Sequence, residues 1–202
     1  ILDLSDKAIQ PMSSNSGRWK IVFNGEIYNF LELKIKISKD KNLKPNFWKS
    51  SGDTEILVNL IDLYGIDETL NLIEGMFSFV AWDNQENQII LARDRLGEKP
   101  LYFLKDENYL VFSSEIIAIK KFNKNKLSLD INSIRELTKY NYIPSPNTIY
   151  QKVKKLDTGT YLKINSDLTN LSISNYWNPV NFSKNYNKKI DLNKIPEEVE
   201  NL

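Results

Sequence analysis

Asn24, Gly25 and Glu26 form the first group of residues in this sequence that could carry chemistry, and they follow an apolar run typical of a strand. One interpretation is a tight turn in which the glycine supplies a positive φ. The other is an oxyanion hole, because an asparagine amide and a neighbouring backbone N–H can both donate to the oxygen that becomes negative during acyl transfer. The three residues alone leave both interpretations open.

Two more groups could act on charged ligands. Asp53 lies in the segment Ser-Gly-Asp-Thr-Glu at residues 51–55, where its carboxylate either complements a helix dipole or binds a substrate ammonium. Residues 93–100 carry three cationic and two anionic side chains. This segment is either an exposed connection with internal ion pairs or a structured loop beside a functional cleft.

Several classes of chemistry are excluded by residues that the sequence lacks. It has no cysteine and no histidine, which excludes zinc fingers, cysteine proteases and Ser-His-Asp hydrolases. All seven glycines are isolated, so neither common glycine-rich phosphate loop can form. The carboxylates show no metal-ligand spacing, and we therefore expect no metal site.

Composition and charge narrow the remaining classes. The 202 residues have ordinary globular composition, and the net charge of +1 argues against nucleic-acid or membrane partners. The sequence has neither an apolar run of about 18 residues nor a signal peptide, which predicts a cytoplasmic protein.

The hydrophobic pattern predicts both helices and strands around these groups. The run at residues 76–82 is apolar at nearly every position, so we expect a strand covered on both faces. Asn24 and Gly25 are expected to end the first strand, and Gly65 to stop the main helix. The expected helices are residues 28–38, 53–64 and 131–140; the expected strands are residues 19–23, a meander of 76–83, 88–92, 101–104 and 109–113, and a hairpin of 159–164 with 171–173.

Taken together, the motifs resemble a known family in both order and spacing. They are residues 23–29, 51–55, 75–83, 92–102 and 112–115. This set resembles the N-terminal glutamine amidotransferase type-2 domain of glutamine-hydrolysing asparagine synthetases. Residues 142–150, with Lys155, Leu156 and Gly159, resemble the stretch that leads toward the synthetase domain.

The resemblance implies an α+β fold of the N-terminal nucleophile hydrolase type. This fold is a four-layer α/β/β/α sandwich of antiparallel sheets, here truncated at its N-terminus. We expect the amidotransferase domain at residues 1–178 and a linker toward an absent synthetase domain at 179–202. The resemblance also suggests a homodimer for the intact protein.

The resemblance also implies a reaction and a set of site residues. In the family, an N-terminal cysteine thiolate attacks the glutamine amide and its own α-amine acts as the base. Asn24 and Gly25 would be the oxyanion donors, and Asp53 would pair with the glutamine α-ammonium. Glutamine would also be bound by Ile1, Leu2, Asn24, Gly25 and Glu26.

The departures from the family pattern concern residues that would precede Ile1. They include the cysteine nucleophile and the arginine that holds the α-carboxylate, so we expect an internal fragment that is inactive and poorly stable by itself. No cofactor is expected in this domain, and ATP and magnesium would belong to the synthetase domain. The sequence does not identify the ammonia acceptor. A non-catalytic glutamine sensor or docking module is the alternative, and a generic interaction domain would leave the motifs unexplained.

Overall fold

The computed structural model describes residues 3, 5–124 and 127–180. A six-stranded antiparallel sheet has the order β1-β2-β3-β4-β8-β9, and a three-stranded sheet has the order β6-β5-β7. The strands are β1 (Met12–Ser13), β2 (Trp19–Ile27), β3 (Gly75–Asp83), β4 (Gln88–Arg93), β5 (Tyr102–Lys105), β6 (Leu110–Ser113), β7 (Val153–Lys155), β8 (Thr160–Asn165) and β9 (Ser172–Asn175). The helices are α1 (Phe30–Asp40), α2 (Asp53–Leu72), α3 (Ile116–Phe122) and α4 (Ile131–Tyr140), with short 3-10 turns at Asp6–Ala8 and Pro45–Phe47.

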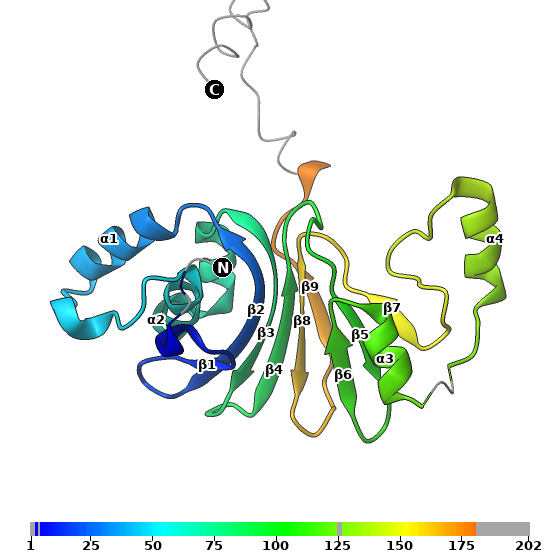
Figure 1. The fold of residues 1–202 in the computed structure, drawn as a ribbon, viewed down its shortest axis with the longest axis horizontal. Coiled ribbons are helices and arrows are strands. Elements are labelled where there is room, and N and C mark those ends of the chain that lie inside the picture. The colour runs from blue at the N-terminus through cyan, green and yellow to red at the C-terminus, as the bar shows by residue number, and fades with distance from the viewer. Residues whose placement is uncertain (1–2, 4, 125–126, 181–202) are drawn as a thin grey trace, which may run out of the picture.

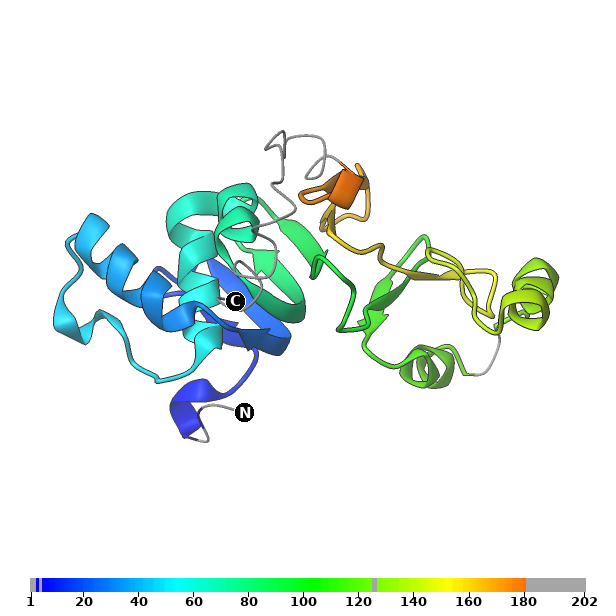
Figure 2. The ribbon, with the colours of Figure 1, turned by 90° about the horizontal axis from the view of Figure 1, so that it is seen from above.

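These elements form four layers. Helices α1 and α2 cover one face of the large sheet, and the small sheet with α3 and α4 lies on the other side (Figure 1). Seen from above, the two helix pairs occupy opposite ends of the molecule (Figure 2). This arrangement is the expected α/β/β/α sandwich.

Side-chain alternation along β3 explains why the large sheet is covered on both faces. Phe77, Phe79 and Ala81 belong to the core against α1 and α2. Val80 points the other way, into a second core that includes Phe103 of the small sheet. A third core places α3 against the outer face of the small sheet. The expectation that this strand is buried on both faces is confirmed.

The tight-turn interpretation of Asn24 and Gly25 is wrong. Strand β2 continues through both residues to Ile27, and Asn24 and Gly25 lie opposite Ser78 and Phe77 of β3. An Asn-Gly pair is a strong local turn signal, but nine continuous pairs with β3 outweigh it here.

The four strands of the predicted meander are present, and β3 pairs with β4 and β5 with β6, but the prediction of one continuous meander is wrong because the two pairs belong to different sheets. Strand β4 pairs with β8, whereas β5 pairs with β6 and β7. Residues 93–100 carry the chain from one sheet to the other, and strand pairing between distant segments leaves no local sequence signal.

Other element predictions hold with shifted ends. The helix at Ile131–Tyr140 and the pairing of β8 with β9 are confirmed. Gly65 breaks the helical geometry with a φ of 80°, but a further helical segment reaches Leu72, so it kinks α2 instead of ending it. The short elements β1, β7 and α3 were not predicted.

Two expectations from the sequence concern the division of the chain near its C-terminal end and the lack of a membrane-spanning segment. The predicted division at residue 178 stays a prediction, and residues 181–202 of the predicted linker lie outside the described residues. In the part of the chain that the structure describes, no helix combines the length and apolar character needed to cross a bilayer.

Candidate active site

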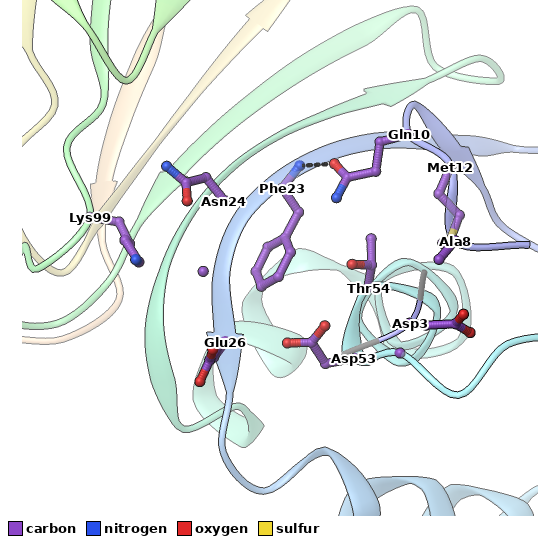
Figure 3. Close-up of a pocket in the computed structure, with 12 residues that line it drawn as sticks. Asp3, Ala8, Gln10, Met12, Phe23, Asn24, Glu26, Asp53, Thr54 and Lys99 are labelled. Carbon is purple, nitrogen blue, oxygen red and sulfur yellow. Dashed lines mark hydrogen bonds between the residues drawn. The ribbon is translucent and has the colours of Figure 1, made fainter. Parts of the chain in front are cut away.

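A pocket of about 270 Å³ opens at the outer edge of β2, beside the start of α2 (Figure 3). Asn24, Gly25, Glu26 and Asp53 all line it, so the structure brings these predicted residues together. The predicted residues Ile1 and Leu2 lie outside the described residues. The full lining is Asp3, Ala8, Gln10, Met12, Phe23, Asn24, Gly25, Glu26, Gly52, Asp53, Thr54 and Lys99.

The backbone N–H of Gly25 faces this pocket. The N–H groups of Phe23 and Ile27, on either side of it, donate away from β3, to Gln10 Oε1 at 2.6 Å and to Asp53 Oδ2 at 2.9 Å. Backbone groups alternate along a strand, so the Gly25 N–H points in the same direction. The β3 partner of Gly25, Phe77, directs its own N–H and C=O to Asp94, which agrees with this orientation.

Close approach of β2 and β3 explains why residue 25 is a glycine. An added Cβ on Gly25 would overlap the Met76 carbonyl oxygen and lie 2.7 Å from Phe77 Cα. Gly75 meets β2 in the same way, where a Cβ would overlap the Glu26 carbonyl oxygen. The two glycines allow the strands to come together at the pocket.

Asn24 projects from the face of β2 that is turned toward the small sheet. Its Nδ2 group donates to Ser114 Oγ at 3.1 Å, which orients the amide with a residue that follows β6. An amide nitrogen carries two hydrogens, so Asn24 retains one for a ligand. Figure 3 shows Asn24 and Lys99 on one side of β2, with Phe23 and Asp53 on the other.

Asp53 places a buried negative charge at the opposite end of the pocket. It is the first residue of α2, and its exposed fraction is 5%. Burial raises the pKa of Asp53 above its ordinary value and the negative charge of Glu26 raises it further, while hydrogen bonds from the N–H groups of Ile27 and Thr54 oppose this shift. A cationic group of a ligand beside Asp53 would lower its pKa again and so favour the ionised carboxylate.

Two further carboxylates hold the loop that precedes α2. Glu55 accepts the Lys49 and Ser50 N–H groups at 2.8 Å each, and Asp3 accepts the Ser51 N–H at 2.9 Å. The hydrogen bonds from Ser51 and Ser5 hold the pKa of Asp3 well below its usual range. These bonds fix the loop that leads to Asp53 without occupying the Asp53 side chain.

Residues 93–100 form a structured loop, as one of the two sequence interpretations proposed. Asp94 is buried and its carboxylate accepts N–H groups from Phe77, Leu96, Glu98 and Lys99. Arg93 donates to three backbone carbonyls, those of Gly97, Lys99 and Leu156. The side chains of Arg93, Asp94 and Arg95 bind backbone groups, and no ion pair forms within this segment, so the interpretation as an exposed connection with internal ion pairs is wrong.

Sequence reasoning missed several residues of the pocket. Gln10 and Met12 gave no signal, because both reach the pocket only through their tertiary placement beside β2, whereas Thr54 lay within the motif at residues 51–55 without being named as a site residue. Lys99 lies in the loop whose length had suggested a nearby cleft, but nothing local distinguished it from the other lysines. Among the described residues, no group of three or more acidic side chains is arranged to hold a metal ion.

The fold and this pocket define a class of protein. Residues 1–177 match the family profile described as "Glutamine amidotransferase domain", and the chain belongs to that family.

The relatives by sequence are asparagine synthetases. A Methanocaldococcus jannaschii protein, provisionally named glutamine-hydrolysing asparagine synthetase 2, is 34% identical over 94% of this chain and 38% of its own length. The glutamine-hydrolysing asparagine synthetase 2 of Bacillus subtilis is 32% identical over 88% of this chain and 23% of its own length. The chain therefore spans well under half of these relatives.

A solved structure supports the fold. The glutamine phosphoribosylpyrophosphate amidotransferase of B. subtilis aligns with a TM-score of 0.61 at 20% identity, covering 86% of this chain and 33% of that one. At this identity the likeness concerns the fold alone.

Proposed function

We propose that this chain is the glutaminase domain of an asparagine synthetase. It binds glutamine in the β2 pocket and helps convert it to glutamate and ammonia, which the longer protein uses for ATP-dependent amidation of aspartate. Asn24 and Gly25 donate to the oxyanion, Asp53 binds the α-ammonium, and Glu26 contributes to the glutamine pocket. Ile1 and Leu2 are proposed to line the same pocket through their backbone.

One observation carries this proposal: the placement of a donor and a carboxylate on the same strand edge. Asp53 contacts the Ile27 N–H, and the Gly25 N–H lies two residues away, at a distance of about 7 Å along a strand. Four bonds separate the α-nitrogen of glutamine from its amide carbon, a span of about 5 Å when extended. An ammonium at Asp53 therefore leaves the amide oxygen within reach of the Gly25 N–H, and Asn24 lines the same pocket.

The attacking group is not among these 202 residues, which contain no cysteine. The reaction of the family needs a thiolate, and the pocket offers donors and carboxylates without one. We therefore propose that the 202-residue chain alone does not release ammonia from glutamine. An ammonia assay on the purified chain tests this, and release above the buffer rate would contradict it.

The remaining parts of the proposal concern the longer protein. ATP and magnesium act in the synthetase domain and this domain needs no cofactor; the linker begins near residue 179. The intact protein is a cytoplasmic homodimer. A Gibberella zeae relative that is 30% identical is named amidase chry2 and not asparagine synthetase. Aspartate as the ammonia acceptor is therefore a separate proposal from glutamine hydrolysis.

The test compares two nitrogen sources in the gene product that carries this chain. Asp53→Asn removes the partner of the glutamine ammonium, so the Michaelis constant for glutamine is expected to rise at least tenfold, as for a lost charged hydrogen bond. Product formation from free ammonia should stay unchanged, because ammonia does not use this pocket. Equal loss with both nitrogen sources would contradict the assigned role.

The alternative is a non-catalytic module that binds glutamine. It predicts binding of glutamine without any hydrolysis by the complete gene product. A complete gene product that hydrolyses glutamine excludes this alternative.

A further inference from the structure

Among the described residues that line the pocket, Lys99 is the one cation, and it has no role in the proposed function. The other charged residues of the lining are the acids Asp3, Glu26 and Asp53. Across the described residues, the ion pairs are Arg18 with Asp83 and Lys152 with Asp106, so the Lys99 ammonium has no carboxylate partner there. A partly buried lysine at the wall of an acidic pocket is available for an anionic ligand group.

The position of Lys99 specifies which end of the ligand it can meet. It lies on the same side of β2 as Asn24, away from Asp53 (Figure 3). If Asp53 binds the α-ammonium, Asn24 and Lys99 are at the end where the amide reacts. Lys99 is thus separated from the head group of the amino acid.

The backbone of Lys99 is held in place by the same residues that organise the oxyanion site. Its N–H donates to Asp94 Oδ2 at 2.9 Å, and its C=O accepts from Arg93 Nε at 2.8 Å. Asp94 Oδ2 also accepts the N–H of Phe77, the β3 partner of Gly25. Asp94 is therefore a positioning residue that fixes the Lys99 backbone relative to Gly25.

We propose that Lys99 recognises the negative charge that develops at the amide end of the ligand. Overall, hydrolysis breaks the C–N bond of a neutral amide and forms a C–O bond with the oxygen of water. One proton of the water goes to the departing nitrogen, giving ammonia, and the other is released from the new carboxylic acid, which leaves a γ-carboxylate. The ammonium of Lys99 therefore favours the oxyanion and the product glutamate over the neutral substrate amide. This inference rests on the proposed function, because it requires that glutamine bind with its amide at Asn24 and Gly25.

The test compares two ligands that differ only at the γ end. L-glutamine and L-glutamate are titrated separately into the wild-type chain and into Lys99→Met at neutral pH, by calorimetry or NMR. The affinity for glutamate is expected to fall about tenfold in Lys99→Met, as for one hydrogen bond to a charged group, while the affinity for glutamine stays unchanged. Lys99→Arg should keep the wild-type ratio, and so should Lys105→Met, because Lys105 is exposed and does not line the pocket.

Each result has a defined meaning. An unchanged ratio of the two affinities in Lys99→Met overturns this inference alone. Equal weakening of both ligands also overturns it, because that result would place Lys99 at the α-carboxylate. Failure of the wild-type chain to bind either ligand overturns the proposed function together with this inference.

Discussion

Asn24 has a single amide group to offer the reaction, and Ser114 fixes its direction. An oxyanion donor acts mainly in the transition state, when the oxygen becomes negative. Asn24→Ala should therefore lower the turnover of glutamine hydrolysis by roughly 10² to 10³, with little change in the Michaelis constant. Steady-state kinetics of the complete gene product measure this.

A matched control for Asn24→Ala is Asn84→Ala, an exposed asparagine outside the pocket lining. The control should retain wild-type turnover. If Asn24→Ala also retained it, Asn24 would have no part in the oxyanion hole.

The raised pKa of Asp53 gives glutamine binding a pH dependence. Only the ionised carboxylate attracts the α-ammonium, and burial makes Asp53 take up its proton at a higher pH than an ordinary aspartate. Glutamine affinity should thus weaken as the pH falls through this raised pKa, above the usual value of 3.8. The free energy of unfolding changes in the opposite direction to glutamine affinity. Because the pKa of Asp53 is higher in the folded than in the unfolded chain, its protonation stabilises the folded state as the pH falls.

Titrations of L-glutamine across a pH series check this prediction. The decline should disappear in Asp53→Asn, whose residual affinity should not depend on pH in that range. A decline of the same size in the variant would assign the pH dependence to another group.

The types of the candidate site residues left their roles open, the resemblance to the family assigned those roles, and neither predicted the contacts. The sequence named Asn24, Gly25, Glu26 and Asp53, which the pocket brings together. Sequence could not show that Ser114 or Gln10 would reach β2, because both approach it only after the chain has folded.

The buried carboxylate of Asp94 holds two elements beside the pocket, the strand β3 and the loop at residues 93–100. Asp94 accepts four backbone N–H groups and joins β3 to the loop at residues 93–100. Asp94→Ala leaves these donors without their acceptor, so the free energy of unfolding should fall by about 3 kcal/mol. Urea denaturation of the chain measures the change.

The control for Asp94→Ala is Glu98→Ala in the same loop, because Glu98 is exposed. Its effect should stay within about 0.5 kcal/mol. Equal effects of the two substitutions would show that the carboxylate of Asp94 does not hold the loop.

At the level of elements, local pattern predicted most helices and strands but not their pairing. The nearly continuous apolar run of β3 and the helical period of α2 are local properties, and both elements are present. After Arg93 the chain passes from the large sheet to the small sheet. This passage depends on hydrogen bonds of Arg93 and Asp94 to backbone groups in the tertiary structure, which no local sequence pattern predicts.

At the scale of the whole molecule, the pocket lies at a sheet edge where β2 is only partly paired among the described residues. Strand β1 pairs only with Lys20 and Ile21 of β2, and the side chains of Gln10 and Asp53 accept the outward N–H groups of Phe23 and Ile27. The expectation that the isolated chain is poorly stable stays a prediction, and this edge is where the chain would be most open to self-association.

The central claim is that this chain holds glutamine by its ammonium at Asp53. The most direct measurement is a calorimetric titration of L-glutamine into the 202-residue chain and its Asp53→Asn variant, because binding does not need the absent thiolate. We predict binding by the wild-type chain and an affinity at least tenfold lower in the variant. Equal affinity in both, or no binding by a wild-type chain whose circular dichroism shows it to be folded, would contradict the account.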